Sequence, residues 1–218
     1  MLSKDILEIL DQTTTCAVSD VLVKMGTRSY MGSRIRALNN HRLAGYALTM
    51  ERRDLEMNPS KNAIPGRVFV EMIETAEPST VFVISSIARM EVALWGGLVA
   101  AAASKRGAGG VVCDGPVRDP LEINDVQLPC FATGAIPSGP AGIQNLAAVN
   151  EPVWCGGVLV RPGDFVFGDS NGVVVIPAGK EREVLEESVK VERGDQEAMK
   201  RILAGAGLID TMNALGRF

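Results

Sequence analysis

Apolar residues recur along this chain with two different spacings, and each spacing predicts a different kind of element. Near the N-terminus a spacing of three to four residues predicts helices over residues 3–10 and 15–25, the second ending at Gly26. Further on, short apolar runs rich in β-branched residues predict buried strands. These strands cover residues 43–50, 80–85, 110–114 and 130–134, and two or three more fall within 156–177.

Helical patterns lie between and after these strands. One helix is predicted within residues 63–79, ending at Pro78, and another over 97–106, ending at Gly107. A short helix begins after Asp119, and a charged helix fills about 179–203. Alternating strands and helices predict an α/β fold built from packed layers. We expect a single domain over residues 1–218, with helical arms at about 1–26 and 179–218.

Composition and charge exclude several classes of protein. The 218 residues are 46% hydrophobic, which suffices for one sizeable core. A net charge of −4 argues against a nucleic-acid-binding surface. No apolar run reaches the roughly 18 residues that a membrane-spanning helix needs. Charges within the first apolar pattern are unlike a signal peptide. A cytoplasmic protein without a membrane partner is therefore predicted.

Cysteine and histidine offer little catalytic chemistry. The four cysteines are Cys16, Cys113, Cys130 and Cys155, and no two of them form a CxxC pair. With one histidine in the chain, a zinc site of the usual spacing is absent. We interpret the cysteines as buried reduced thiols. His41 is expected in a surface loop before a strand rather than as a catalytic base.

Two glycines open the helix that follows the strand at 80–85. Free backbone N–H groups at such a helix start bind anions, and glycine lets a ligand approach the backbone. Gly96 and Gly97 could instead serve close packing of helix on strand. Neither GxxxxGK[ST] nor GxGxxG is present, so nucleotide binding has little support.

The next strand leads into Arg118 and Asp119. Residues that follow strands in layered α/β proteins face a crevice. Arginine carries a fork of donors that matches a carboxylate, and aspartate offers oxygen ligands to Mg²⁺ or Mn²⁺. The plainer alternative is that Asp119 caps the next helix, with Pro120 at its first position and Glu122 three residues after the cap.

Together the helix start and the Arg–Asp pair describe a site for a small carboxylate beside a divalent metal. A 2-oxo acid chelates such a metal through its carboxylate and keto oxygens, and the metal then stabilises an enolate. This is the chemistry of a metal-dependent aldolase or β-decarboxylase.

An ordered series of blocks resembles one known family. The segments "ALWGGLVAAAASKRGAGGVVCDGPVRDPLEI", "PCFATGAIPSGP" and "VWCGGVLVRPGDFVFGDSNGVVVIP" resemble the family of regulator of ribonuclease activity A, and "TTTCAVSDVL" fits its opening pattern. The family includes the 4-hydroxy-4-methyl-2-oxoglutarate / 4-carboxy-4-hydroxy-2-oxoadipate aldolases. The resemblance covers about residues 13–212 and implies an α-β-β-α sandwich with helical arms, assembled as a homotrimer or homohexamer.

The resemblance also implies roles for particular residues. Arg118 would bind the pyruvate moiety of a small 2-oxo carboxylic acid and stabilise its enolate. Asp119 would ligate Mg²⁺ or Mn²⁺. The substrate carboxylate would contact backbone N–H groups of Gly96, Gly97, Leu98 and Val99.

The chain departs from the family at acidic positions. The aldolases carry an acid 21 residues before the arginine, where it holds metal-bound water, and this chain has Gly97 there. Glu91 is one substitute for that acid. Glu192 or Glu197 could supply the C-terminal acid that the aldolases take from an adjacent subunit. Ala206 stands where the family's "GELGLD" has an acid.

Three functions from different classes remain open. The first is a metal-dependent lyase that cleaves a 4-hydroxy-2-oxo dicarboxylic acid to pyruvate and an oxo acid, or decarboxylates oxaloacetate. The second is a non-catalytic protein that binds and regulates a ribonuclease. The third is a related enzyme acting on a different oxo or hydroxy acid. The apolar tail, with Leu208, Ile209, Met212 and Leu215, is expected to dock on a neighbouring subunit.

Overall fold

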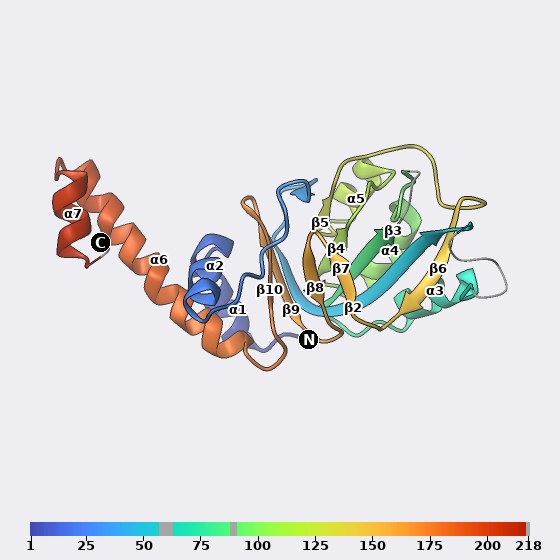
Figure 1. Ribbon diagram of the computed structural model, residues 1–218, viewed down its shortest axis with the longest axis horizontal. Helices are drawn as coiled ribbons and strands as arrows, with labels where there is room; N and C mark the ends of the chain where they lie inside the picture. Colours follow the sequence, from blue (N-terminus) through green and yellow to red (C-terminus); the bar gives the residue numbers. More distant parts are fainter. Residues whose placement is uncertain (57–62, 88–90, 217–218) are drawn as a thin grey trace.

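The fold is built on one large mixed sheet. The computed structural model describes residues 1–56, 63–87 and 91–216. Its eight-stranded sheet has the strand order β1-β5-β4-β3-β2-β9-β10, and β6 pairs with β2 beside this path. Figure 1 shows the sheet with its covering helices at one end of the long axis and a helical arm at the other.

The parallel part of the sheet consists of β2 to β5. β2 pairs with β3, β3 with β4 and β4 with β5, each pair parallel. Such strands are covered on both faces, which is why they appear in the sequence as continuous apolar runs. β2 extends four residues beyond its predicted end, into charged sequence. The four strands are β2 (Leu43–Asp54), β3 (Thr80–Ile87), β4 (Gly110–Cys113) and β5 (Cys130–Ala132).

Three helices connect these strands and pack on one face of the sheet. They are α3 (Gly66–Glu74), α4 (Gly97–Lys105) and α5 (Pro120–Asp125). The predicted stop of α4 is confirmed, because Gly107 has a φ of +75° in the left-handed region that favours glycine. The predicted stop of α3 is wrong, since that helix ends before Thr75 and Pro78 lies in the following loop.

Antiparallel strands complete the sheet and its second face. β9 pairs antiparallel with both β2 and β10, and the short β1 pairs with β5. The separate hairpin of β7 and β8 packs against β3 and β2. Three strands within 156–177 agree with the prediction, whereas β1, β6 and β7 have no predicted counterpart. The bounds are β1 (Arg36–Ala37), β6 (Gln144–Val149), β7 (Val153–Cys155), β8 (Val158–Val160), β9 (Phe165–Asp169) and β10 (Gly172–Ile176).

Helices from both ends of the chain pack together on β9 and β10. Their apolar faces and the strands form a cluster of buried residues, which includes Val18, Phe165 and Leu185. The predicted α/β fold with N- and C-terminal helices is thereby confirmed. No helix in the described ranges is long and apolar enough to cross a membrane. The helices that pack there are α1 (Lys4–Leu10), α2 (Thr15–Lys24) and α6 (Glu181–Leu203), whereas α7 (Leu208–Ala214) packs on α6.

Candidate functional site

Three backbone segments join at the carboxyl ends of β3 and β4. The N–H of Arg118 donates to the carbonyl of Trp95 at 2.9 Å, and the N–H of Leu94 donates to the carbonyl of Pro116 at 2.9 Å. The N–H of Val117 donates to the carbonyl of Gly134, also at 2.9 Å. These bonds fix the predicted Arg–Asp turn against the start of α4. The two predicted parts of the site are therefore adjacent, as their positions after neighbouring parallel strands require.

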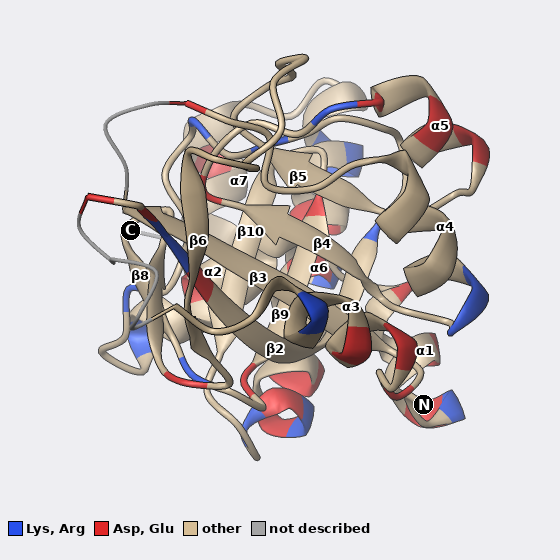
Figure 2. Ribbon diagram, turned by 90° about the vertical axis from the view of Figure 1, so that its right-hand side faces the viewer, with Lys and Arg blue, Asp and Glu red and all other residues tan. Residues whose placement is uncertain are grey.

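Two glycines make room for the Arg118 side chain. A Cβ added at Gly96 would lie 3.0 Å from Cγ and Nε of Arg118, and one at Gly139 would lie 3.2 Å from its Nη1. Nε of Arg118 is 3.5 Å from Oδ2 of Asp119, and the two side chains are 48% and 40% exposed. The pair is thus open to a ligand. In Figure 2 the chain changes from basic to acidic immediately before α5.

Asp119 precedes α5 but its side chain does not cap that helix. The residue has a φ of +56° and a ψ of +49°, and its carboxylate makes no capping bond to α5. Side-chain capping needs an extended backbone at this position, so the left-handed conformation prevents it. Oδ2 instead accepts the N–H of Gly97 at 3.1 Å, at the start of α4. The predicted Asp119–Glu122 capping box is wrong, whereas Pro120 does occupy the first position of α5.

The predicted anion-binding loop is the first turn of α4. Gly96 is the N-cap residue, and Gly97, Leu98 and Val99 begin the helix. The N–H of Gly97 is used by Asp119. For the N–H groups of Leu98 and Val99 the described residues provide no acceptor, as expected for a helix start. These two donors remain for a ligand, and the positive end of the helix dipole favours an anion there.

Glu122 lies against the position where the aldolases carry an acid. A Cβ added at Gly97 would be 2.9 Å from Cβ of Glu122 and 3.3 Å from Cβ of Asp119. From the sequence, Glu122 was expected only to take part in capping, because its proximity to Gly97 depends on how α4 and α5 pack. Glu91, the substitute considered from the sequence, is exposed. Among the described residues, Arg118 and Asp119 interact with each other and with Gly97, and neither forms a bond with Glu91.

The C-terminal acids lie on α6, far from this site within one chain. Figure 1 places α6 and α5 toward opposite ends of the long axis. Glu192 accepts a hydrogen bond from the hydroxyl of Thr14 at 2.9 Å. Glu197 accepts one from the Nε–H of Arg201 at 2.8 Å. Neither acid can complete the site of its own chain. Ala206 lies in the turn between α6 and α7.

The thiols and the histidine lie elsewhere. Cys113, Cys130 and Cys155 are buried and reduced, as predicted, whereas Cys16 is exposed. Burial raises the pKa of Cys130 to about 12 and raises the pKa of Cys113 and Cys155 well above the usual range. Neutral buried thiols are poor nucleophiles. His41 is partly buried in the loop before β2. Its backbone N–H donates a hydrogen bond to Oδ1 of Asn39.

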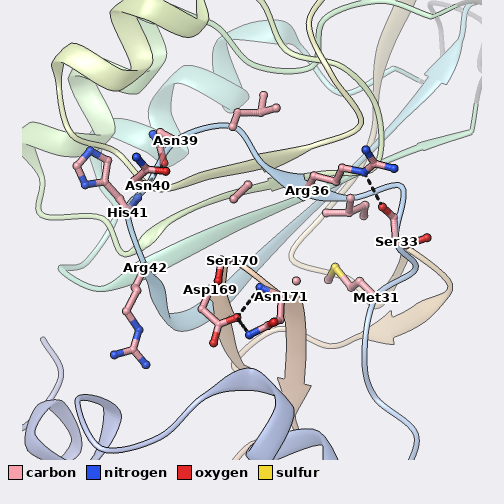
Figure 3. A pocket seen from close by; sticks show the side chains of 14 residues that line it. Met31, Ser33, Arg36, Asn39, Asn40, His41, Arg42, Asp169, Ser170 and Asn171 are labelled. Carbon is pink, nitrogen blue, oxygen red and sulfur yellow. Dashed lines mark hydrogen bonds between the residues drawn. The ribbon is translucent and has the colours of Figure 1, made fainter.

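A wide groove of about 810 Å³ lies away from the Arg–Asp pair, between residues 31–42 and the turn at 169–172 (Figure 3). Its charged side chains already serve the fold. Asp169 accepts the N–H and hydroxyl of Thr15, at 2.8 and 2.7 Å. Arg42 donates to the carbonyls of Leu10 and Thr13, both at 2.8 Å. The groove therefore has weaker chemical grounds for a site than the Arg–Asp pair.

A family model and several known proteins match most of the chain. The family model described as "RraA-like: Aldolase/RraA" matches residues 15–175. The chain is 34% identical over 194 residues to a Halalkalibacterium halodurans protein named "Putative 4-hydroxy-4-methyl-2-oxoglutarate aldolase", covering 88% of this chain and 84% of that one. It is 39% identical over 125 residues to an uncharacterised Methanocaldococcus jannaschii protein. That match spans 57% of this chain and 60% of the relative.

Solved structures show the same fold. An uncharacterised protein from Pseudomonas syringae superposes with a TM-score of 0.85 at 23% identity, covering 98% of this chain and 95% of that one. Streptomyces coelicolor RraAS2, described as an unusual member of the RNase ES inhibitor RraA family, superposes with a TM-score of 0.77 at 22% identity, covering 91% and 97%. Sequence and fold together show that the chain belongs to the RraA-like aldolase family.

Proposed function

We propose that the protein is a divalent-metal-dependent carbon–carbon lyase that acts on a 2-oxo carboxylic acid. It would cleave a 4-hydroxy-2-oxo dicarboxylic acid to pyruvate and a second oxo acid, with oxaloacetate decarboxylation as a further activity. One observation supports this most directly. Arg118, Asp119 and the open N–H groups of Leu98 and Val99 converge at one helix start.

The residues present suit Mg²⁺ or Mn²⁺. No group of three or more His, Cys, Asp or Glu side chains that could hold a metal occurs in the described residues. Mg²⁺, however, keeps several waters and is commonly held by one or two carboxylates together with the substrate. Asp119 offers a half-exposed carboxylate, and the side chain of Glu122 begins beside it at Gly97. A bound ion would supply Lewis acidity toward the keto oxygen of the substrate.

The protein groups divide the remaining work. The guanidinium of Arg118 carries donors for the substrate carboxylate and for negative charge that develops on the keto oxygen. The N–H groups of Leu98 and Val99 orient the same carboxylate at the positive end of α4. Asp119 would hold the ion, and its bond to the N–H of Gly97 fixes the carboxylate in place. Each of these groups has its position set by the backbone bonds between the two strand ends.

The absence of an acid at Gly97 affects the choice of reaction. In metal sites generally, losing a side chain that hydrogen-bonds to the ligands of the metal lowers metal affinity or enzyme activity by about 10- to 100-fold. Decarboxylation of oxaloacetate needs charge stabilisation but no base for a distant hydroxyl. We therefore expect faster oxaloacetate decarboxylation than aldol cleavage, with Glu122 as the nearest replacement acid.

The direct test measures pyruvate release from oxaloacetate and from 4-hydroxy-4-methyl-2-oxoglutarate, with Mg²⁺ or Mn²⁺ and again with excess chelator. We expect turnover that the chelator removes. Asp119→Asn keeps an oxygen for the N–H of Gly97 but loses the charge, and we expect a loss of at least about 100-fold, a magnitude typical of lost electrostatic groups. Asp125→Asn, on the exposed end of α5, is the matched control and should retain activity.

Two results would contradict the proposal. Absence of turnover on both substrates, even with Mn²⁺, would remove the lyase assignment and favour another oxo acid or a ribonuclease-binding role. Equal activities of Asp119→Asn and Asp125→Asn would place the reaction elsewhere on the chain.

A further inference from the structure

A small cavity beside the start of α4 contains a second arginine. The cavity has a volume of about 170 Å³, and its lining includes Arg118 and the first residues of α4. Arg52, near the end of β2, lies on its wall. The charged end of β2 was not connected with the site in the sequence, because β2 and α4 are separated by more than 40 residues.

Arg52 is buried without a compensating acid. The residue is 9% exposed, and its Nε has no hydrogen-bond partner. Within the described residues no carboxylate forms an ion pair with it, whereas the adjacent Arg53 is paired with Glu51 at 2.6 Å. Its guanidinium stacks on the ring of Phe69, with Cζ 4.8 Å from the ring centroid. Burial lowers the pKa of Arg52, yet arginine keeps its proton at any physiological pH. A buried, unpaired cation is costly to a fold and needs an explanation.

A second unsatisfied donor lines the same cavity. Trp95 is 3% exposed, and its Nε1 has no acceptor. The lining residues with polar side chains are Arg52, Trp95 and Arg118, and each of these side chains is a hydrogen-bond donor. Leu98 and Val99, at the start of α4, also line the cavity. No carboxylate side chain is among the lining residues. Such a wall matches an anion, since carboxylate oxygens satisfy several donors at once and neutralise the cation.

We propose that Arg52 binds the second carboxylate of the substrate and so makes the enzyme select 2-oxo dicarboxylates over 2-oxo monocarboxylates. Arg118 would hold the carboxylate beside the keto group and Arg52 the distal one, because both line one cavity. The identity of the ligand rests on the proposed function, whereas the need for an anion at Arg52 follows from its burial. Arg52 is a specificity residue in this scheme and takes no part in bond cleavage.

The test compares two non-cleavable probes by calorimetry in the presence of Mg²⁺. 2-Oxoglutarate carries two carboxylates, and 2-oxobutyrate carries one. Arg52→Met removes the donors and keeps an unbranched side chain over Phe69. We expect it to weaken 2-oxoglutarate binding by about 10- to 100-fold, the range for a lost charged hydrogen bond. Binding of 2-oxobutyrate should change less than about threefold, since it never reaches Arg52.

Two further variants control for structure and charge. Arg67→Met removes an exposed arginine on the neighbouring α3, paired with Glu71 only at 3.8 Å, and should leave both affinities unchanged. Arg52→Lys keeps the charge without the planar fork and should lie between wild type and Arg52→Met. Thermal unfolding without ligand checks the fold. Arg52→Met should melt no lower than wild type, because it removes an unpaired buried charge.

The outcomes separate this inference from the proposed function. The role of Arg52 would be overturned if Arg52→Met weakened the binding of 2-oxoglutarate and 2-oxobutyrate equally, or weakened the binding of neither. It would also be overturned if the wild type did not bind 2-oxoglutarate. Turnover of a dicarboxylate with an unchanged KM in Arg52→Met would also overturn it while the lyase assignment stands. Arg52-dependent binding in a protein without lyase activity would support the anion site and reject the reaction.

Discussion

At the scale of single residues, glycines shape the site through the side chains they lack. Gly96 and Gly139 leave space for Arg118, and Gly97 leaves space for Glu122. None of these three needs glycine for its φ, since none lies in the left-handed region. Their importance is steric, and it depends on neighbours that are distant in sequence. Asp119 shows the reverse case, because there a side chain is held in a backbone conformation that most residues avoid.

Gly97 and Gly66 allow a matched test of this steric role. Each is the first residue of its helix, but an added Cβ would meet Glu122 at 2.9 Å in the first case and nothing within 4 Å in the second. Gly97→Ala should lower the free energy of unfolding by about 1–3 kcal/mol through overpacking. Gly66→Ala should be neutral or stabilising by up to about 1 kcal/mol. Urea denaturation measures the free energy of unfolding of both variants. Equal effects would show that α5 moves to make room for the Cβ at residue 97, contrary to the prediction.

At the scale of elements, carboxylates join segments that are far apart in sequence. Asp119 connects α5 to the start of α4 through Gly97. Asp169, at the end of β9, connects that strand to the start of α2 through Thr15. In both cases a side chain at the end of one element satisfies an N–H group that the first turn of a helix leaves free. These contacts set the positions of the helices that cover the sheet.

Asp169→Ala tests the second contact. Its carboxylate accepts two bonds from Thr15 and two from Asn171, at 2.7–3.1 Å. We expect a loss of about 2–3 kcal/mol in the free energy of unfolding, because hydrogen bonds to charged groups are among the stronger ones. Ser170→Ala, an exposed change in the same turn, should cost little. A loss no larger than that of Ser170→Ala would show that water replaces the carboxylate at the start of α2.

At the scale of the whole molecule, the end of α6 and α7 reach away from the sheet (Figure 1). This arm exposes large apolar side chains, with Leu203 79%, Leu208 62% and Ile209 68% exposed. Met212 and Leu215, which the sequence also assigned to docking, are partly buried. Exposed apolar groups of this kind typically mark a protein–protein interface. We propose that the arm docks on a second copy of the chain, within a homotrimer or homohexamer.

Light scattering after size-exclusion chromatography tests this assembly. The double variant Leu203→Lys, Leu208→Lys places two charges on the arm and should lower the mass of the assembly, because burying unpaired charges opposes association. Val70→Lys, a change at a 46% exposed residue of α3, is the control and should leave the mass unchanged. A monomeric wild type, or a double variant of unaltered mass, would contradict the proposal.

The sequence by itself determined the α/β fold, most of the elements and the candidate residues around Arg118. These depend on short-range information, since apolar spacing sets strands and helices, and glycine stops them. Strand ends that carry polar residues then predict a site at one edge of the sheet. The length of β2 was underestimated, because its charged end does not have the apolar pattern of a strand.

Only the tertiary structure decided which distant residues surround the Arg–Asp pair. The direction of the Asp119 side chain depends on a left-handed backbone that no local pattern specifies. The contact of Glu122 with Gly97 depends on how two helices pack. The burial of Arg52 depends on where β2 ends relative to α4. Side-chain identity is local, whereas burial and the loss of partners arise from packing between segments far apart in the chain.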